Sequence, residues 1–303
     1  MHRRYSVLLP YLALLLATAS WGGLFHVGKY VVSVINPVWF TSLRYVAAAS
    51  LLLPLLVSGR MSAVHLREGV WLRLSGLGFL GYGFFPILVF YGLKYSLPTH
   101  GAVIMATMPV TTLLVDWAKS RRRPTANAWL VVGCAVLGVT LVAGLWGAPT
   151  SIPRFAWLGD LVAWVGTLGW IAYTHDAARF RDLSYTQYTV WTTVLAAPWL
   201  LLIAVLASWG GCIAWPSEAQ LVEIVPAMTY VVVAATVGAA LTYNFGIRQL
   251  GPARGIVFVN AIPITAVLIS LALGQMPSAQ EWAGIVLVIA ALLVHALFVA
   301  GKH

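Results

Sequence analysis

Charged side chains are scarce in this chain of 303 residues. Asp, Glu, Lys and Arg together make up 9% of the sequence, whereas hydrophobic residues make up 61% and the mean hydropathy is +0.89. A soluble domain carries about 25% charged residues. So little polar surface could not cover a globule that faces water on all sides. The composition therefore excludes an ordinary soluble fold and indicates a polytopic membrane protein.

Cysteine is also rare, and the common catalytic motifs are missing. Cys134 lies in an apolar block and Cys212 in a polar connector, so the two form neither a disulfide framework nor a metal motif. The sequence has no Gly-x-Ser-x-Gly, no P-loop and no cluster of histidines with metal-ligand spacing. We therefore expect no cofactor and no metal, and enzyme chemistry finds little support.

Long apolar runs, separated by charges or prolines, divide the chain into ten segments of membrane-spanning length. A transmembrane helix needs about 20 apolar residues, so ten spans use about 200 residues and leave only short connectors. The predicted spans are 8–28, 37–57, 71–93, 98–118, 128–146, 156–176, 185–208, 226–248, 253–274 and 281–301. The sequence thus predicts an all-α integral membrane protein with ten transmembrane helices and no separate soluble domain.

Lys and Arg collect at one end of these spans. Of the 18 Lys and Arg residues, Lys29, Lys94 and Arg154 lie on the side opposite the N-terminus, Arg44 lies within a span, and the others lie on the N-terminal side. Cytoplasmic connectors collect basic residues, so both termini are expected in the cytoplasm and the connector 209–225 outside. We interpret the net charge of +10 as this topology signal in a multipass inner-membrane protein, and not as a nucleic-acid surface.

The second half of the chain repeats the first. With an offset of 154, residues 92–114 align with 246–268 and seven of the 23 positions are identical; a weaker match with an offset of 149 places Trp21 on Trp170. The repeats are residues 1–149 and 150–303, with five spans each. Because five is odd, the second copy must run inverted in the membrane, as in secondary transporters. The identical pairs are Gly92/Gly246, Pro98/Pro252, Gly101/Gly255, Val103/Val257, Pro109/Pro263, Thr111/Thr265 and Leu114/Leu268.

Inverted repeats place a binding site near the bilayer midplane, where broken helices expose backbone groups. Pro109 and Pro263 lie about 11 residues into their spans, hence near the centre. Each proline removes a helical hydrogen bond and frees a carbonyl. The sequence therefore places both prolines on the predicted pathway.

Several short motifs resemble those of one family. They are Trp21-Gly22, Leu43-Arg44-Tyr45, Leu93-Lys94-Tyr95-Ser96 and the stretch Gly133–Gly138. With them the chain resembles the EamA-type ten-span transporters of the drug/metabolite transporter superfamily over nearly its whole length. The resemblance implies alternating-access transport of a small metabolite, often export of an amino acid, with spans one, three, four, six, eight and nine lining the pathway. It does not fix the substrate.

Arg44 is the only charged residue well inside a predicted span. An Arg at the centre of a transmembrane helix costs about 2.5–3.5 kcal/mol on insertion scales. Three roles remain open: it faces a polar cavity, it makes an interhelix contact, or it snorkels to the surface. In a cavity, a carboxylate would be its natural ligand.

The other candidate pathway residues are aromatic or polar side chains within apolar runs. Rings with one polar atom can stack on a solute and orient it, although packing is an alternative for each. Asn side chains can bond a solute or another helix. His100 and its repeat equivalent Arg254 lie at helix N-termini, where a cation is unfavourable, and could act in gates or attract anions. The candidates are Trp21, Tyr82, Tyr91, His100, Trp170, Tyr173, Tyr243, Asn244 and Asn260, with Arg44, Pro109 and Pro263.

The carboxylates lie away from the centres of the spans. Asp160 begins span six and Asp176 ends it, which disfavours proton coupling through a central acid. A facilitator, an exchanger or histidine-linked coupling stays open. The sequence thus predicts a secondary transporter that exports amino acids or related compounds. Its expected partners are a small-molecule substrate and the lipid bilayer, without nucleic acid; a homodimer is possible but not indicated. The alternative is a multipass membrane enzyme or receptor without transport activity.

Overall fold

The described part of the chain is helical and contains no strand. The computed structural model describes residues 2–57, 69–121, 126–142, 146, 152–177, 179–180, 182–250, 258–259 and 261–300. Its elements are α1 (His2–Val34), α2 (Pro37–Val57), α3 (Val70–Phe79), η2 (Leu80–Phe84), α4 (Phe85–Tyr95), α5 (Pro98–Ala106), α6 (Met108–Ser120), α7 (Ala126–Val142), α8 (Ala156–Ala177), α9 (Tyr185–Trp209), α10 (Glu218–Thr229), η3 (Tyr230–Gly238), α11 (Ala239–Leu250), α13 (Ala261–Ala272) and α14 (Ala279–Ala300).

Five helical stretches among the described residues are long and apolar enough to cross a membrane, and a sixth is a bent pair. The bent pair joins α5 to α6 at an angle of 44°. Three shorter apolar helices come from α7, α13 and α14. The protein is therefore an all-helical, multipass membrane protein. The five stretches are Leu8–Val34, Pro37–Leu56, Val70–Tyr95, Tyr185–Trp209 and Glu218–Leu250.

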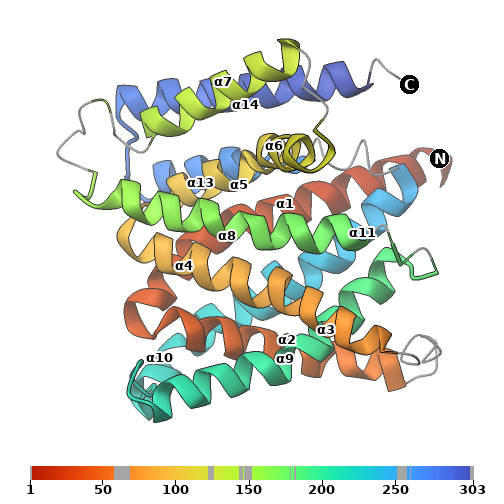
Figure 1. Cartoon of the computed structure of the whole chain (residues 1–303), viewed down its shortest axis with the longest axis vertical. Helices are drawn as coiled ribbons and strands as arrows, with labels where there is room; N and C mark the ends of the chain where they lie inside the picture. The colour runs from red at the N-terminus through yellow and green to blue at the C-terminus, as the bar shows by residue number, and fades with distance from the viewer. Residues whose placement is uncertain are drawn as a thin grey trace.

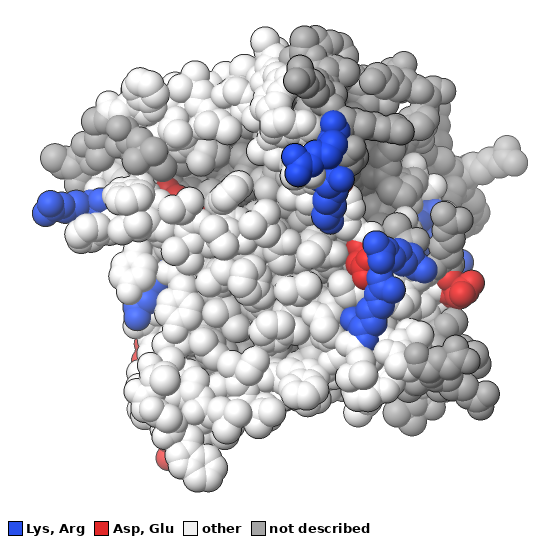
Figure 2. Space-filling model, in the orientation of Figure 1, with Lys and Arg blue, Asp and Glu red and all other residues white. Residues whose placement is uncertain are grey.

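Most of the helices run across the view of Figure 1, and α1 begins at the same end of the bundle at which α14 finishes. On the face drawn in Figure 2, a broad area over α4, α8 and α9 is free of charged side chains, which lie to its left and right. An uncharged area of this kind can face lipid tails, because the hydrocarbon core of a bilayer holds no water to solvate a charge. The bilayer normal therefore runs along the helices.

Capping residues fix several helix boundaries and correct one predicted connector. The sequence predicts a long connector over 209–225, whereas α10 already begins at Glu218. The reason is a capping box, in which the Ser217 hydroxyl accepts from the Gln220 N–H and the Gln220 side chain accepts from the Ser217 N–H. Ser184 and Gln187 cap α9 in the same way.

The predicted span 98–118 consists of two helices. It breaks at Thr107 between α5 and α6, two residues before Pro109. A proline has no N–H to donate and its ring collides with the preceding turn, so a helix bends or ends just before it. The break lies where the sequence predicts freed backbone groups.

Glycines allow close approach at two equivalent helix crossings. Where α4 crosses α8, a Cβ on Gly92 would collide with the carbonyl oxygen of Gly159. Where α11 crosses α1, a Cβ on Gly246 would collide with Leu14 and lie 3.1 Å from the carbonyl oxygen of Pro10. Positions 92 and 246 differ by 154, and positions 10 and 159 by 149. These are the two offsets that relate the halves of the sequence.

Candidate functional site

Two π-helical segments interrupt the apolar stretches Val70–Tyr95 and Glu218–Leu250 near their middles. η2 carries Tyr82 and η3 carries Thr236, whose hydroxyl donates to the carbonyl of Val231 over 2.6 Å. Positions 82 and 236 are again 154 apart. A π-helix widens the turn, leaves backbone groups unevenly paired and occurs often at functional sites. The two segments therefore mark the centre of the candidate site.

Arg44 points from α2 toward η3 and is 6% exposed. Its Nε donates a 2.7 Å hydrogen bond to the Thr236 hydroxyl, and its guanidinium carbon lies 4.9 Å from the centre of the Tyr45 ring. Of the three open roles, snorkelling to the surface is excluded because the side chain is buried. The guanidinium has five N–H donors, and among the described residues it uses one of them.

Tyr45 joins Arg44 to a cluster of aromatic rings on η2, α8 and α9. The Tyr82 and Tyr173 hydroxyls are 2.7 Å apart, and the two ring centres are 5.1 Å apart. Tyr45 lies 4.9 Å from Tyr82, and Tyr188 lies 4.9 Å from Tyr173, between ring centres. Trp170 packs 5.2 Å from Tyr173. The sequence predicts Tyr82, Trp170 and Tyr173 as pathway residues, and the structure brings these three together.

Two further predicted rings pack together on α1 and α11. Trp21 on α1 packs against Tyr243 on α11, with ring centres 5.1 Å apart. The next residue, Asn244, is buried and its Nδ2 donates to the Thr189 hydroxyl on α9 over 3.3 Å. Asn244 thus makes the interhelical bond that is the commoner use of a buried amide.

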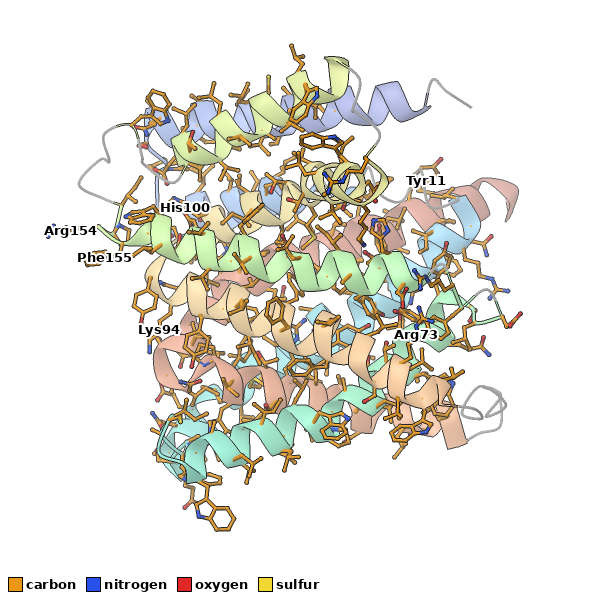
Figure 3. The ribbon with its side chains drawn as sticks, viewed as in Figure 1. Tyr11, Arg73, Lys94, His100, Arg154 and Phe155 are labelled. Atoms are coloured by element: carbon orange, nitrogen blue, oxygen red, sulfur yellow. The ribbon has the colours of Figure 1, made fainter. Side chains whose placement is uncertain are left out.

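His100 lies away from these rings, at the end of the bundle that also carries Lys94 and Arg154 (Figure 3). It is fully buried, with Nδ1 2.9 Å from Asp160 Oδ2 and Nε2 3.5 Å from Glu281 Oε1. The Ser96 hydroxyl donates to Asp160 Oδ1. His100 therefore has no open face for an anion, and this buried polar cluster ties α5 to α8 and α14.

Four further candidates lie outside these groups. Tyr91 donates to Asn36 over 3.0 Å near the end of α4. Pro263 is buried as the third residue of α13. Asn260 and the side chain of Pro109 lie outside the described residues.

A cavity of about 560 Å³ opens between α3, α6 and α8. Asp176 in its wall binds Arg73, which lies at the N-terminal end of the bundle (Figure 3). We call this the charged cavity; its lining is Leu77, Lys119, Ala172, His175, Asp176 and Arg179.

A second cavity of about 560 Å³ lies between α1, α10, η3 and α13. It is near the opposite end, because Tyr30 in its wall is only four residues from the end of α1. We call this the apolar cavity; its lining is Gly23, His26, Val27, Tyr30, Pro226, Ala227, Tyr230, Ile269 and Leu273.

The two cavities are lined by equivalent positions. The offset of 149 that matches Trp21 to Trp170 also matches His26 to His175, and the offset of 154 matches Asp116 to Ser270. His26 Nε2 lies 2.8 Å from the Ser270 hydroxyl, and His175 Nε2 lies 3.2 Å from Asp116 Oδ1. A similar contact is thus made at both ends, between α1 and α13 at one end and between α8 and α6 at the other.

Sequence reasoning missed these contacts although one signal was available. The offset of 149 applied to His26 would have found His175. Asp160 and Glu281 gave no such signal, because a carboxylate near a helix start is usually solvated. In the part of the chain that the structure describes, no group of three or more His, Cys, Asp or Glu residues could hold a metal ion.

Comparison with known proteins gives consistent matches over most of the chain. The profile described as the EamA-like transporter family matches residues 8–144 and again residues 157–297. The uncharacterized transporter YrdR of Bacillus subtilis is 26% identical over 95% of this chain and 91% of that protein. The uncharacterized inner membrane transporter YedA of Escherichia coli is 26% identical over 96% of this chain and 92% of that protein.

The fold is also found in a solved structure. A structure titled "Crystal structure of protein" aligns with a TM-score of 0.62 at 18% identity, covering 95% of this chain and 96% of that one. At this identity the likeness shows the shared fold alone.

Proposed function

Because this chain belongs to the EamA-like transporter family, we propose that it exports an amino acid or a related small carboxylate by alternating access. The family and the named relatives make it a multipass membrane transporter rather than an enzyme. The substrate class, the direction and the mechanism are what we add. In this proposal, ten spans form two inverted repeats, residues 1–149 and 150–303, with both termini in the cytoplasm.

The observation that carries the proposal is the pairing of the two cavities. Each lies at one end of the bundle, and each is lined by the first helix of one half together with the third and fourth helices of the other. Inverted repeats can exchange conformations, so that the end open in one state is closed in the other. Two equivalent cavities at opposite ends are the starting geometry for such an exchange.

The proposed binding site lies between the cavities. Arg44 and Tyr82 are each 6% exposed, so this conformation encloses both residues. A buried guanidinium binds a carboxylate through paired, charge-assisted hydrogen bonds. The rings of Tyr82, Trp170 and Tyr173 offer flat apolar surface with polar edges for the rest of the solute. These features together favour a small carboxylate over a purely apolar substrate.

Metabolite analysis tests this proposal in cells. We would compare the medium of cells that carry an empty vector, the wild type or Trp170→Ala at matched membrane expression. Export predicts that one class of carboxylates rises with the wild type and returns to the vector level with the variant, because Trp170 packs inside the aromatic cluster. An unchanged medium, with no counterflow of any standard amino acid in proteoliposomes, would overturn the proposal.

The two native cysteines test the proposed orientation. Cys212 is exposed in the connector between α9 and α10, whereas Cys134 is half-buried on α7. A membrane-impermeant maleimide added to intact cells is expected to label the wild type but not Cys212→Ser. Labelling of Cys212 only after permeabilisation would reverse the orientation.

A further inference from the structure

The two cavities are equivalent in position but opposite in chemistry. Where the charged cavity has Lys119, Asp176 and Arg179, the equivalent positions near the apolar cavity are Leu273, Val27 and Tyr30. Since one half of the molecule builds this cavity without charge, the fold itself does not require the charges. We therefore look for a role of these charges that is specific to the N-terminal end of the bundle.

The ion pairs of the charged cavity do not use all of its cationic hydrogen-bond donors. Asp176 accepts from Arg73 Nη2 over 2.6 Å and from Arg179 Nε over 2.9 Å, so one carboxylate serves two guanidinium groups. Among the described residues, Lys119 has no acidic partner. The His175 and Asp116 side chains pair with each other. The cavity therefore has a net positive charge, and its partly enclosed shape concentrates the resulting field.

We propose that the charged cavity is a docking site for the carboxylate group of the substrate, with Lys119 and Arg179 as the residues that recognise it. This inference rests on the proposed function and adds where the substrate is first selected. The Lys119 ammonium has three donors, and the Arg179 guanidinium keeps its terminal N–H groups, because Asp176 is bound through Nε. A carboxylate held by both would sit at the mouth of the pathway.

The same helix connects this cavity to the aromatic cluster. Ala172, His175 and Asp176 of α8 face the cavity, while Trp170 and Tyr173 of α8 belong to the cluster beside Tyr82. A solute released from the docking site thus moves about one helical turn along α8 to reach the rings, and Arg44 lies beyond them. The docking site and Arg44 would act in sequence on the same carboxylate.

Cations at the end of a membrane helix also bind lipid phosphates, and both ligands are oxyanions. Lipid phosphates and the substrate carboxylate require the cationic side chains to lie in different places. Snorkelling to headgroups requires only exposure at the membrane surface, as for Arg121, which is exposed at the end of α6. Docking requires the lining of a cavity, which includes Lys119 and Arg179 but not Arg121. Arg121→Gln is therefore the matched control.

The first arm of the test measures the charge of the cavity without a substrate. In a full-length protein with Cys134→Ala and Cys212→Ser, Ala172→Cys places one thiol in the lining. We expect an anionic methanethiosulfonate to react faster than a cationic one, and Lys119→Leu with Arg179→Tyr to lower this rate ratio about tenfold. Arg121→Gln should leave the ratio unchanged. A ratio unaffected by the double variant would overturn the proposal.

The second arm tests recognition of the carboxylate. Each standard amino acid, and alaninamide as the probe that lacks a carboxylate, is added during labelling in phosphatidylcholine vesicles with and without phosphatidylglycerol. Docking predicts that at least one amino acid slows labelling, that alaninamide does not, and that the double variant loses the protection. Protection by none of them, or protection abolished by phosphatidylglycerol because headgroups occupy the cations, would overturn the proposal.

Counterflow of the same amino acids into proteoliposomes distinguishes failure of the docking site from failure of the proposed function. Transport by the Ala172→Cys protein without protection of its introduced thiol would remove the docking site and leave the proposed function standing. Absence of both transport and protection would remove both.

Discussion

Arg44→Met is expected to reduce transport of small carboxylates by about 30-fold or more while leaving the folded protein intact. Removing one partner of a buried, hydrogen-bonded charge pair costs about 2–5 kcal/mol of binding. Arg44 is buried beside Tyr45, and within the described residues it donates through Nε alone, to Thr236, so most of its donors remain for a ligand. Methionine supplies a chain of similar length without charge or donors.

The free energy of unfolding of Arg44→Met is expected to stay the same or rise although transport falls, which makes the experiment selective. Burying a cation beside neutral partners is unfavourable, and replacing a buried charge by an apolar side chain is often neutral or stabilising. Thr236 keeps its bond to the Val231 carbonyl when the guanidinium is removed. A loss of transport with an unchanged melting temperature would therefore report on ligand binding and not on folding.

Counterflow in proteoliposomes and thermal melting of the detergent-solubilised protein measure the two quantities. Arg44→Lys is the graded variant, because lysine keeps the charge but loses the planar pair of donors, and we expect intermediate transport. Thr236→Val is the control for the hydrogen bond alone and should have a small effect. Normal counterflow by Arg44→Met would reduce Arg44 to an interhelix contact.

The sequence is informative where one physical rule dominates. Apolar runs and loop charges predict a helical membrane protein, and the two offsets relate positions that the structure uses alike, such as Gly92 and Gly246. From the sequence we predict Tyr82 and Tyr173 as pathway residues but not Tyr45 and Tyr188, although all four are tyrosines within predicted spans. The sequence does not separate them, since only the packing of α2 and α9 brings Tyr45 and Tyr188 to the same cluster.

Other parts of the site depend on information that a single sequence does not contain. The π-helical segments η2 and η3 arise from backbone pairing within apolar runs and have no residue signature. Asp160 and Glu281 stand at helix starts, where a carboxylate ordinarily faces water, whereas both are at most 5% exposed. Whether a carboxylate at a helix start is solvated depends on what packs over it, here His100 and Ser96.

Asp160→Ala is expected to destabilise the protein by about 3 kcal/mol or more, the usual cost of removing one member of a buried ion pair. Asp160 accepts from Ser96 and lies 2.9 Å from His100 Nδ1. Its loss removes the carboxylate that both groups share, and leaves Ser96 Oγ and His100 Nδ1 with only their mutual contact of 3.1 Å in its place. Because these groups join α5 to α8, the helices should separate at the end of the bundle that faces away from the N-terminus.

Thermal melting of the solubilised protein measures this effect, with an expected decrease of about 10 °C. Glu218→Gln, which changes an exposed carboxylate at the start of α10, is the control and should melt like the wild type. A double-mutant cycle between Asp160→Asn and His100→Gln isolates the pair, because each variant keeps the approximate size of its side chain. Additive effects in that cycle would mean that His100 and Asp160 contribute to stability independently and that their contact does not hold α5 against α8.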